Sequence, residues 1–369
     1  MFQTKNFQSI VASAINRMRS SQSAITDFHI GSVVRTLIEA PAIELDEFYQ
    51  RVLYGLLEAI PTAIYHAFNF DALPAAYAGG KVRFSTPTLV VSPVAIPIGT
   101  VVQRPDTRVR YLTTEAASIA AGANHVDVRV LAEYSGVNGN APAGVITSLS
   151  GYLDQINAVV NLDPIVGGKE AESDEERKVR FLSYVGSLSR GTVWAINYAA
   201  SSATVLGTGG DIAEYVTRIG IDEGAGRVDV YILGSAGEPT TELVTAAQSI
   251  IDGKSPTSTD FTWTPGYRSA GTEVTVKPMQ ITTVDIGMRV SFYSVESTID
   301  SAFLLSVRNI LDGALFAASP GDIVQANSLV DAVLGLPDVH QVIYDTSTNV
   351  RCELYEALRL GYLNLTPLV

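Results

Sequence analysis

The sequence predicts a multidomain α+β protein, with N-terminal helices, a small all-β middle domain and a C-terminal α+β domain. Three patterns predict it: apolar residues at helical spacing near the N-terminus, short β-branched runs between turn residues in the middle, and mixed strand and helix patterns in the last part. The expected divisions are residues 1–79 for a helical arm, 80–166 for the β domain and 167–369 for the α+β domain.

Two helices are expected in the arm. The first carries apolar residues on one helical face, from Phe7 to Met18. The second carries an apolar series with steps of four and three, typical of a coiled-coil seam, formed by Val34, Ile38, Pro41, Leu45, Phe48 and Val52. Pro41 either kinks this helix or begins a new one. The pattern fits two interpretations equally well: a hairpin packed on its own domain, and an arm that packs against another chain.

The middle domain is predicted from short strand-like runs. KVRF, TLVVSPVAI and HVDVRVLAEY contain β-branched or aromatic residues, and turn residues such as PIGT (97–100) and GVNGN (136–140) lie between them. Few aromatic residues lie in this block.

The last domain is predicted to open with helices over residues 173–203. Ser173 followed three residues later by Glu176 has the spacing of a capping box. The buried stripe of this helix is expected to be Val179, Leu182, Val185 and Leu188. Strands and helices alternate after residue 212, and the clearest helical period covers 297–316.

Composition excludes several classes of function. The net charge of −13 argues against a nucleic-acid-binding protein, because neutralising phosphates needs a basic surface. No run of about 18 apolar residues is present, so direct membrane insertion is not expected, and the N-terminus lacks a secretory-signal pattern. The four histidines are far apart and Cys352 is the single cysteine, so no metal, cofactor or disulfide is expected.

The densest acidic run lies between Glu170 and Glu176. It fits paired carboxylates for glycan cleavage or cation binding, or a capped helix start balanced by the basic residues that follow. The spacing favours the cap, so no catalytic, cofactor-binding or metal-binding residue is predicted. Trp194 and Trp263 are expected to be core or interface anchors, and the polar loop 253–272 a partner contact.

Several stretches, in chain order, resemble the baseplate J-like proteins of contractile phage tails. The most specific is IVGGKEAESDEERKVRFLSYVGSLSRGTVWAI, residues 165–196. The others are residues 27–49, 95–103, 110–149, 271–290 and 320–345. One departure is AFNFDALPAAYAGGKVRF, residues 67–84, which is shorter than the corresponding stretch in the family.

The resemblance implies a structural, non-enzymatic wedge subunit of a tail baseplate. In such assemblies the protein pairs with a second copy of itself and, through helical bundles, with a tail-protein-I-like subunit. Wedges join other wedge, hub and sheath-proximal proteins in a sixfold ring, which rearranges on sheath contraction. The implied location is the virion tail baseplate, assembled in the host cytoplasm. Hinges near Gly79-Gly80 and Gly167-Gly168 would allow rigid-body movement.

Contact residues are expected on the arm and on the helix of the last domain. They are Val34, Ile38, Leu45, Phe48, Val52, Phe303, Val307 and Leu311. The alternative function is a tail appendage that binds glycans through the β domain or cleaves them with acids such as Glu172 and Glu175. The aromatic residues of the β domain are mainly Tyr111 and Tyr134, which disfavours glycan binding.

Overall fold

The computed structural model describes residues 4–21, 25–254, 264–294, 299–345 and 348–368. The chain divides into two units, Met1–Asp71 and Ala72–Val369. The first unit is helical, and the second holds a barrel-like β sheet followed by an α+β region. The predicted fold class is therefore confirmed.

Two helices form the first unit, α1 (Phe7–Ser20) and α2 (Val33–Ala67). Each begins after a side chain that accepts a backbone hydrogen bond from the first turn, Asn6 for α1 and Ser32 for α2. Pro41 lies inside α2, which continues through it, so neither a break nor a new helix forms there. With 35 residues, α2 is about 52 Å long.

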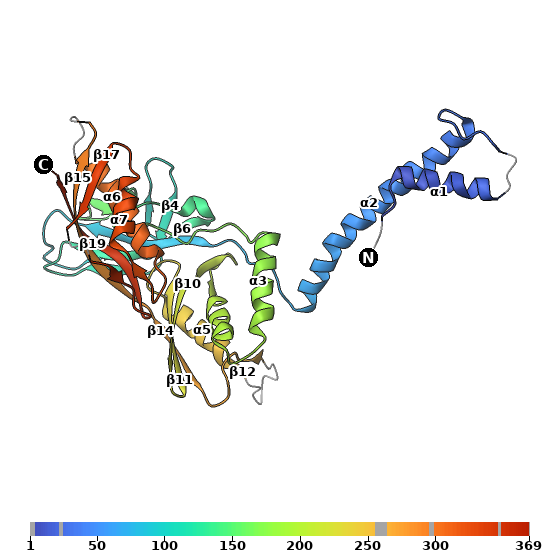
Figure 1. Ribbon diagram of the computed structural model, residues 1–369. Coiled ribbons are helices and arrows are strands. Elements are labelled where there is room, and N and C mark those ends of the chain that lie inside the picture. The colour runs from blue at the N-terminus through green and yellow to red at the C-terminus, as the bar shows by residue number, and fades with distance from the viewer. Residues whose placement is uncertain (1–3, 22–24, 255–263, 295–298, 346–347, 369) are drawn as a thin grey trace. The chain divides into compact units, whose positions relative to one another are not determined.

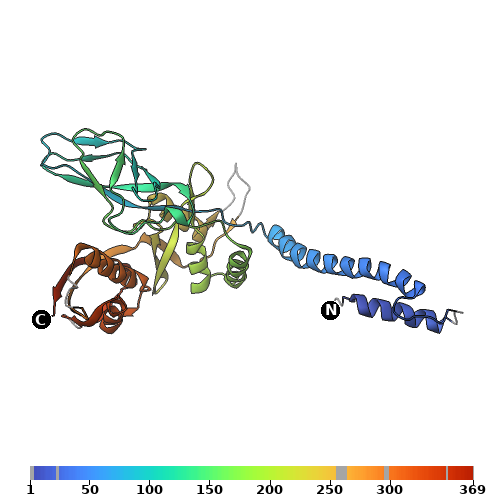
Figure 2. The same ribbon diagram turned by 90° about the horizontal axis from the view of Figure 1, so that it is seen from above.

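Helix α1 packs beside the first half of α2, where Val11 and Ala42 are buried (Figures 1 and 2). No other described helix of this unit lies along the second half of α2. The hairpin is thus real, but it covers only part of the longer helix.

The barrel-like sheet has the strand order β7-β3-β4-β6-β1-β8, and its two end strands lie in contact. The strands are β1 (Tyr77–Ser85), β3 (Val101–Gln103), β4 (Arg110–Thr113), β6 (His125–Ser135), β7 (Ser148–Ser150) and β8 (Ala158–Val160). A ribbon of β2 (Val94–Ile96) and β5 (Ala117–Ile119) contacts the sheet, and a 3₁₀ turn, η1 (Val137–Gly139), follows β6.

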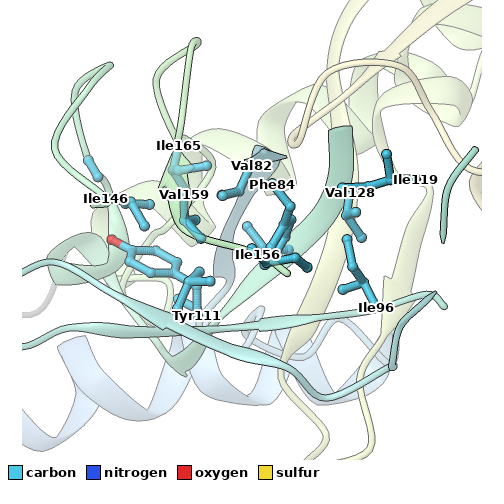
Figure 3. Packing of buried hydrophobic residues seen from close by; sticks show 14 of the residues in the cluster. Val82, Phe84, Ile96, Tyr111, Ile119, Val128, Ile146, Ile156, Val159 and Ile165 are labelled. Carbon is cyan, nitrogen blue, oxygen red and sulfur yellow. The ribbon is translucent and has the colours of Figure 1, made fainter. Parts of the chain in front are cut away.

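Alternating burial along the strands fills the inside of this sheet. Along β6, for example, Val128, Val130 and Ala132 point inward and are buried. Figure 3 shows the side chains of Phe84 and Tyr111 among aliphatic neighbours in this core. The buried Tyr111 hydroxyl donates a 2.9 Å hydrogen bond to the carbonyl of Gly139, so the one polar atom of that ring is satisfied.

The chain enters and leaves the barrel along two segments that pair with each other. Ala76 and Lys169 exchange backbone hydrogen bonds of 2.9 and 3.2 Å, and Gly79 and Val166 exchange bonds of 2.8 and 3.1 Å. The Asn140 side chain donates to the Gly168 carbonyl at 3.0 Å and accepts from its N–H at 2.9 Å. We call residues 76–80, 136–140 and 165–169 the barrel neck.

Glycines in the neck are needed for close packing. A Cβ on Gly80 would lie 2.5 Å from the Ile165 side chain, and one on Gly168 only 2.4 Å from the backbone oxygen of Gly136. Hinges were expected near Gly79-Gly80 and Gly167-Gly168, and the structure shows that all four of these glycines are tightly packed against their neighbours. The boundary predicted at residue 79 also falls inside β1, whereas the first unit ends at Asp71.

After the neck, a sheet of order β14-β11-β10-β9 packs against helices. Its strands are β9 (Thr204–Leu206), β10 (Ile212–Gly224), β11 (Arg227–Gly234) and β14 (Glu273–Pro278), and the helices are α3 (Asp174–Ser187), α4 (Val193–Ser201) and α5 (Thr241–Asp252). A short ribbon joins β12 (Gly253–Lys254) to β13 (Thr264–Pro265). Strands β10 and β11 pair as far as Gly224 and Arg227, so a tight turn at Ala225 and Gly226 joins them.

One edge of this sheet is closed by a side chain. Among the described residues, β14 pairs with β11 alone, which leaves its other edge without a strand. There the Gln248 side chain of α5 donates to the Val274 carbonyl at 2.8 Å and accepts from the Val276 N–H at 2.7 Å. A primary amide thus occupies the positions that a further strand would use.

The last part of the chain has its own core. Strands β15 (Gln280–Phe292), β17 (Val339–Tyr344) and β19 (Glu356–Pro367) form a sheet of order β17-β15-β19 against α6 (Ser301–Ala317) and α7 (Ala326–Leu334). A ribbon of β16 (Ile323–Val324) and β18 (Val350–Arg351) completes it. The predicted single domain 167–369 therefore contains two separate α/β cores (Figure 2).

Phe316 of α6 joins these two cores. The guanidinium of Arg218 lies 4.2 Å from the ring centroid and that of Arg359 lies 4.1 Å from it. Arg359 also forms a 2.6 Å ion pair with the buried Asp312, which accepts a second bond from the Leu360 N–H. Burial lowers the pKa of Arg218, the cation of this group that no described carboxylate pairs with.

Replacing Gly168 by alanine is expected to lower the free energy of unfolding of the second unit by about 1–3 kcal/mol, because the new Cβ meets a backbone oxygen that cannot rotate away. Denaturant unfolding followed by circular dichroism measures this. The control is Gly313→Ala in α6, where a Cβ meets nothing within 4 Å and alanine favours the helix. Equal stability of the two variants would contradict the role given to the neck.

Candidate functional site

Side chains that carry chemistry have structural partners in this fold. Ser173 and Glu176 form the predicted capping box, and hydrogen bonds from the Ser173 backbone and hydroxyl hold the pKa of Glu176 below its usual value. Glu172 accepts two bonds from Arg180, at 2.6 and 2.7 Å, and one from the Leu73 N–H at 2.9 Å. The acidic run therefore fixes the start of α3 and holds it to the segment that precedes β1.

The rest of the described chain offers little else for chemistry. No group of three or more His, Cys, Asp or Glu residues among the described positions is arranged to hold a metal ion. Cys352 is fully buried, and desolvation raises the pKa of its thiol. No helix within the described ranges has the length and apolarity to cross a membrane.

The arm residues expected at an interface are accessible to different degrees. Leu45 is 47% exposed and Phe48 is 59% exposed, whereas Val34, Ile38 and Val52 are half-buried. Part of the predicted coiled-coil seam of α2 is therefore covered within the first unit, and Leu45 and Phe48 remain exposed.

A longer apolar surface lies on the second half of α2 and was not predicted from the sequence. We call it the arm stripe, formed by Leu53, Leu56, Leu57, Ile60 and Ile64. Apart from Leu53, which is half-buried, each of these side chains is at least 41% exposed. The signal was present in the sequence: residues 52–67 carry Glu58 and His66 as their only acidic or basic side chains. Such a helix is unusual in water unless something covers it.

The interface residues expected on the last helix are placed differently. Val307 and Leu311 are fully buried, and they pack in the core between α6 and its sheet. Phe303 is half-buried, with its ring centroid 5.1 Å from that of Phe292. The helical period was correct, but this apolar face covers the domain's own strands, so Val307 and Leu311 hold the fold together and are not accessible to a partner.

On α3, side chains that were expected to be buried are exposed. Val179, Leu182, Val185 and Leu188 were expected to be buried, yet they are between 45% and 65% exposed. The face of α3 that packs inward carries aromatic rings instead, with Tyr184 5.9 Å from Tyr198 of α4. Trp194, at 57% exposure, extends the open apolar surface onto α4. Trp263 and residues 255–263 of the expected partner loop lie outside the described residues.

Residues 81–168 match the family model described as Baseplate J-like protein barrel domain. This range coincides with the barrel-like sheet and ends in the neck. The resemblance predicted from the sequence is confirmed over this domain.

Among solved structures, the chain is similar to a chain in the cryo-EM structure of the anti-feeding prophage baseplate, 6-fold symmetrised. The two are 14% identical, and the similarity covers 94% of this chain and 89% of that chain with a TM-score of 0.36. A search of the curated proteins found no match. The match to a known family therefore concerns residues 81–168.

Replacing Leu311 by alanine is expected to lower the free energy of unfolding of the second unit by about 3 kcal/mol, because it opens a cavity in a packed core. The same replacement at Leu45, which is 47% exposed, is expected to change the stability of the first unit by less than about 1 kcal/mol. Guanidinium unfolding curves compare the two. A small effect at Leu311 would mean that this side chain is not part of the core.

Proposed function

We propose that this chain, which contains a baseplate J-like barrel domain over residues 81–168, is a structural subunit of a contractile-tail baseplate and has no enzymatic role. The match over the barrel domain is the observation that carries this proposal. The surfaces of the described residues support it, because exposed apolar side chains lie along α2 and α3, and Glu172 and Glu176 of the densest acidic cluster are held in structural contacts.

The arm is the part of this subunit that we expect to hold partners. Its stripe residues at 53, 57, 60 and 64 follow steps of four and three, so they lie along one side of α2. Covering about half of each side chain is worth roughly 1 kcal/mol per residue, or about 5 kcal/mol for the stripe before the cost of association. An isolated 15-residue helix is marginal in water, so a helical partner would also stabilise it.

The finer roles are proposals of the same kind. We propose that the subunit belongs to the wedge, pairs with a second copy of itself, and meets a tail-protein-I-like subunit through the arm. Hub and sheath-proximal proteins would then complete the ring in the virion tail, with assembly in the host cytoplasm and rearrangement on sheath contraction. The acidic charge of −13 agrees with a role in protein assembly rather than nucleic-acid binding.

The location is tested by electron microscopy of particles in which this chain carries a tag. Gold or antibody label is expected as a ring at the tail end, at the baseplate. Label on fibres or on the capsid would overturn the proposal, and turnover of peptidoglycan or polysaccharide by the purified chain would overturn its non-enzymatic part.

The arm is tested by placing lysine on two sides of α2. Ile60→Lys puts a charge into the arm stripe and is expected to reduce incorporation of the chain into particles by more than about tenfold, because burying an unpaired charge is costly. Thr62→Lys introduces the same residue outside the stripe, one turn from Glu58, and is expected to leave incorporation unchanged. Quantitative blotting of purified particles measures both. Equal incorporation would show that the arm stripe is not an interface.

A further inference from the structure

A cleft opens between strands of the two α/β cores in the second unit. We call it the tyrosine cleft, lined by Tyr231, Lys277, Pro278, Gln280 and Tyr355. Tyr231 comes from β11, Lys277 and Pro278 come from β14, Gln280 begins β15, and Tyr355 lies one residue before β19. The cleft has a volume of about 490 Å³, which is within the range of sites that hold small ligands.

A glycine brings the two tyrosine rings together. Gly220 of β10 is paired with Tyr231 of β11. A Cβ on Gly220 would collide with the carbonyl oxygen of Leu354, so the backbone that precedes Tyr355 crosses directly over this position. The Gln280 N–H donates to the Tyr355 carbonyl at 2.8 Å. The two ring centroids are 5.9 Å apart and the ring planes are inclined by 57°, so the rings form two fixed walls of the cleft.

The one charged side chain that lines the cleft is already paired. The Nζ atom of Lys277 lies 2.9 Å from Oδ2 of Asp229, and this hydrogen bond raises the pKa of Lys277. Asp229 is only 6% exposed and also lies 3.6 Å from Arg227, so its carboxylate has little left to offer a ligand. Two acids close by in the sequence, Glu353 and Glu356, are outside the lining and disfavour an acidic ligand. The cleft itself therefore suits an uncharged group.

The polar groups that remain open in the cleft are rich in donors. The hydroxyls of Tyr231 and Tyr355 and the amide of Gln280 bond to no other described side chain or backbone group, and Lys277 keeps two further N–H groups. No carboxylate is free to accept. A sugar brings a donor with each hydroxyl and needs acceptors in return. A proline-rich segment brings carbonyl acceptors and has no N–H at its prolines.

We propose that the tyrosine cleft binds a proline-rich, extended segment of another protein. Such a segment forms a polyproline II helix without a partner, so little conformational entropy is lost when it docks on aromatic rings. A prolyl ring would enter between Tyr231 and Tyr355, and the neighbouring carbonyls would accept from Gln280 and Lys277. The inference goes beyond the proposed assembly role and is tested on the purified chain, whereas that role is tested on particles.

Fluorescence anisotropy with the purified full chain tests the ligand class. The probe is a fluorescein-labelled peptide of ten prolines, and the reference is a labelled Gly-Ser peptide of the same length. The proline peptide is expected to bind about tenfold tighter or more. Tyr355→Ser is expected to weaken its binding by about tenfold, because one wall of the cleft is lost. Tyr362→Ser, which changes a tyrosine that is 69% exposed outside the cleft, is expected to leave it unchanged.

A second variant separates loss of the site from loss of the fold. Gln280→Ala removes an exposed amide but keeps the backbone bond to Tyr355, and it is expected to weaken binding by about threefold. Equal binding of the two peptides, or proline-peptide binding that neither Tyr355→Ser nor Gln280→Ala changes, would overturn the inference. Binding of maltoheptaose that Tyr355→Ser abolishes, without binding of the proline peptide, would identify a saccharide site and would overturn it as well.

Discussion

The barrel neck is the constraint on which the second unit depends. A chain that enters a barrel and leaves it at the same place must bring its entering and leaving backbone segments side by side. Here Ala76 pairs with Lys169 and Gly79 with Val166, and the Asn140 amide bonds both polar groups of Gly168. These contacts leave no room for side chains at the crossing, so glycine is required by packing. The entering and leaving segments are consequently held to each other by backbone pairing, and separating them would break that pairing.

Much of the local structure could be predicted from the sequence, because local signals are specific. The spacing of Ser173 and Glu176 gave the start of α3, and β-branched runs between turns gave the barrel. Whether the apolar face of each helix is buried or exposed could not be predicted from such local signals. Leu311 and Leu182 both lie on regular apolar stripes, yet the first is fully buried and the second is 63% exposed. Periodicity shows that a face is apolar, but the partner of that face depends on contacts far apart in the sequence.

The exposed apolar surfaces could also be predicted only in part, because periodicity does not show what covers a helix face. Sequence reasoning placed interface residues on the arm from the steps of its first half, which α1 partly covers, and overlooked the second half, where the arm stripe lies. The sequence also predicted flexibility at Gly79-Gly80 and Gly167-Gly168. A glycine occurs both in flexible hinges and where two backbone segments pack closely, and the sequence alone does not distinguish the two. The exposed apolar side chains of α2 and α3 lie on helices, whereas one face of most strands packs in a core. Association through helices leaves the β structure of each copy undisturbed.

The Gln248 amide on the edge of β14 bears on how molecules of this chain behave when they are held close together. In a large assembly many copies of one chain are held close together, and an open strand edge on each would invite sheets to join end to end without limit. A side chain that fills the donor and acceptor positions at Val274 and Val276 removes this template while leaving the strand in place. With these two backbone groups already bonded to Gln248, β14 has no free donor or acceptor at this point for a strand of another molecule.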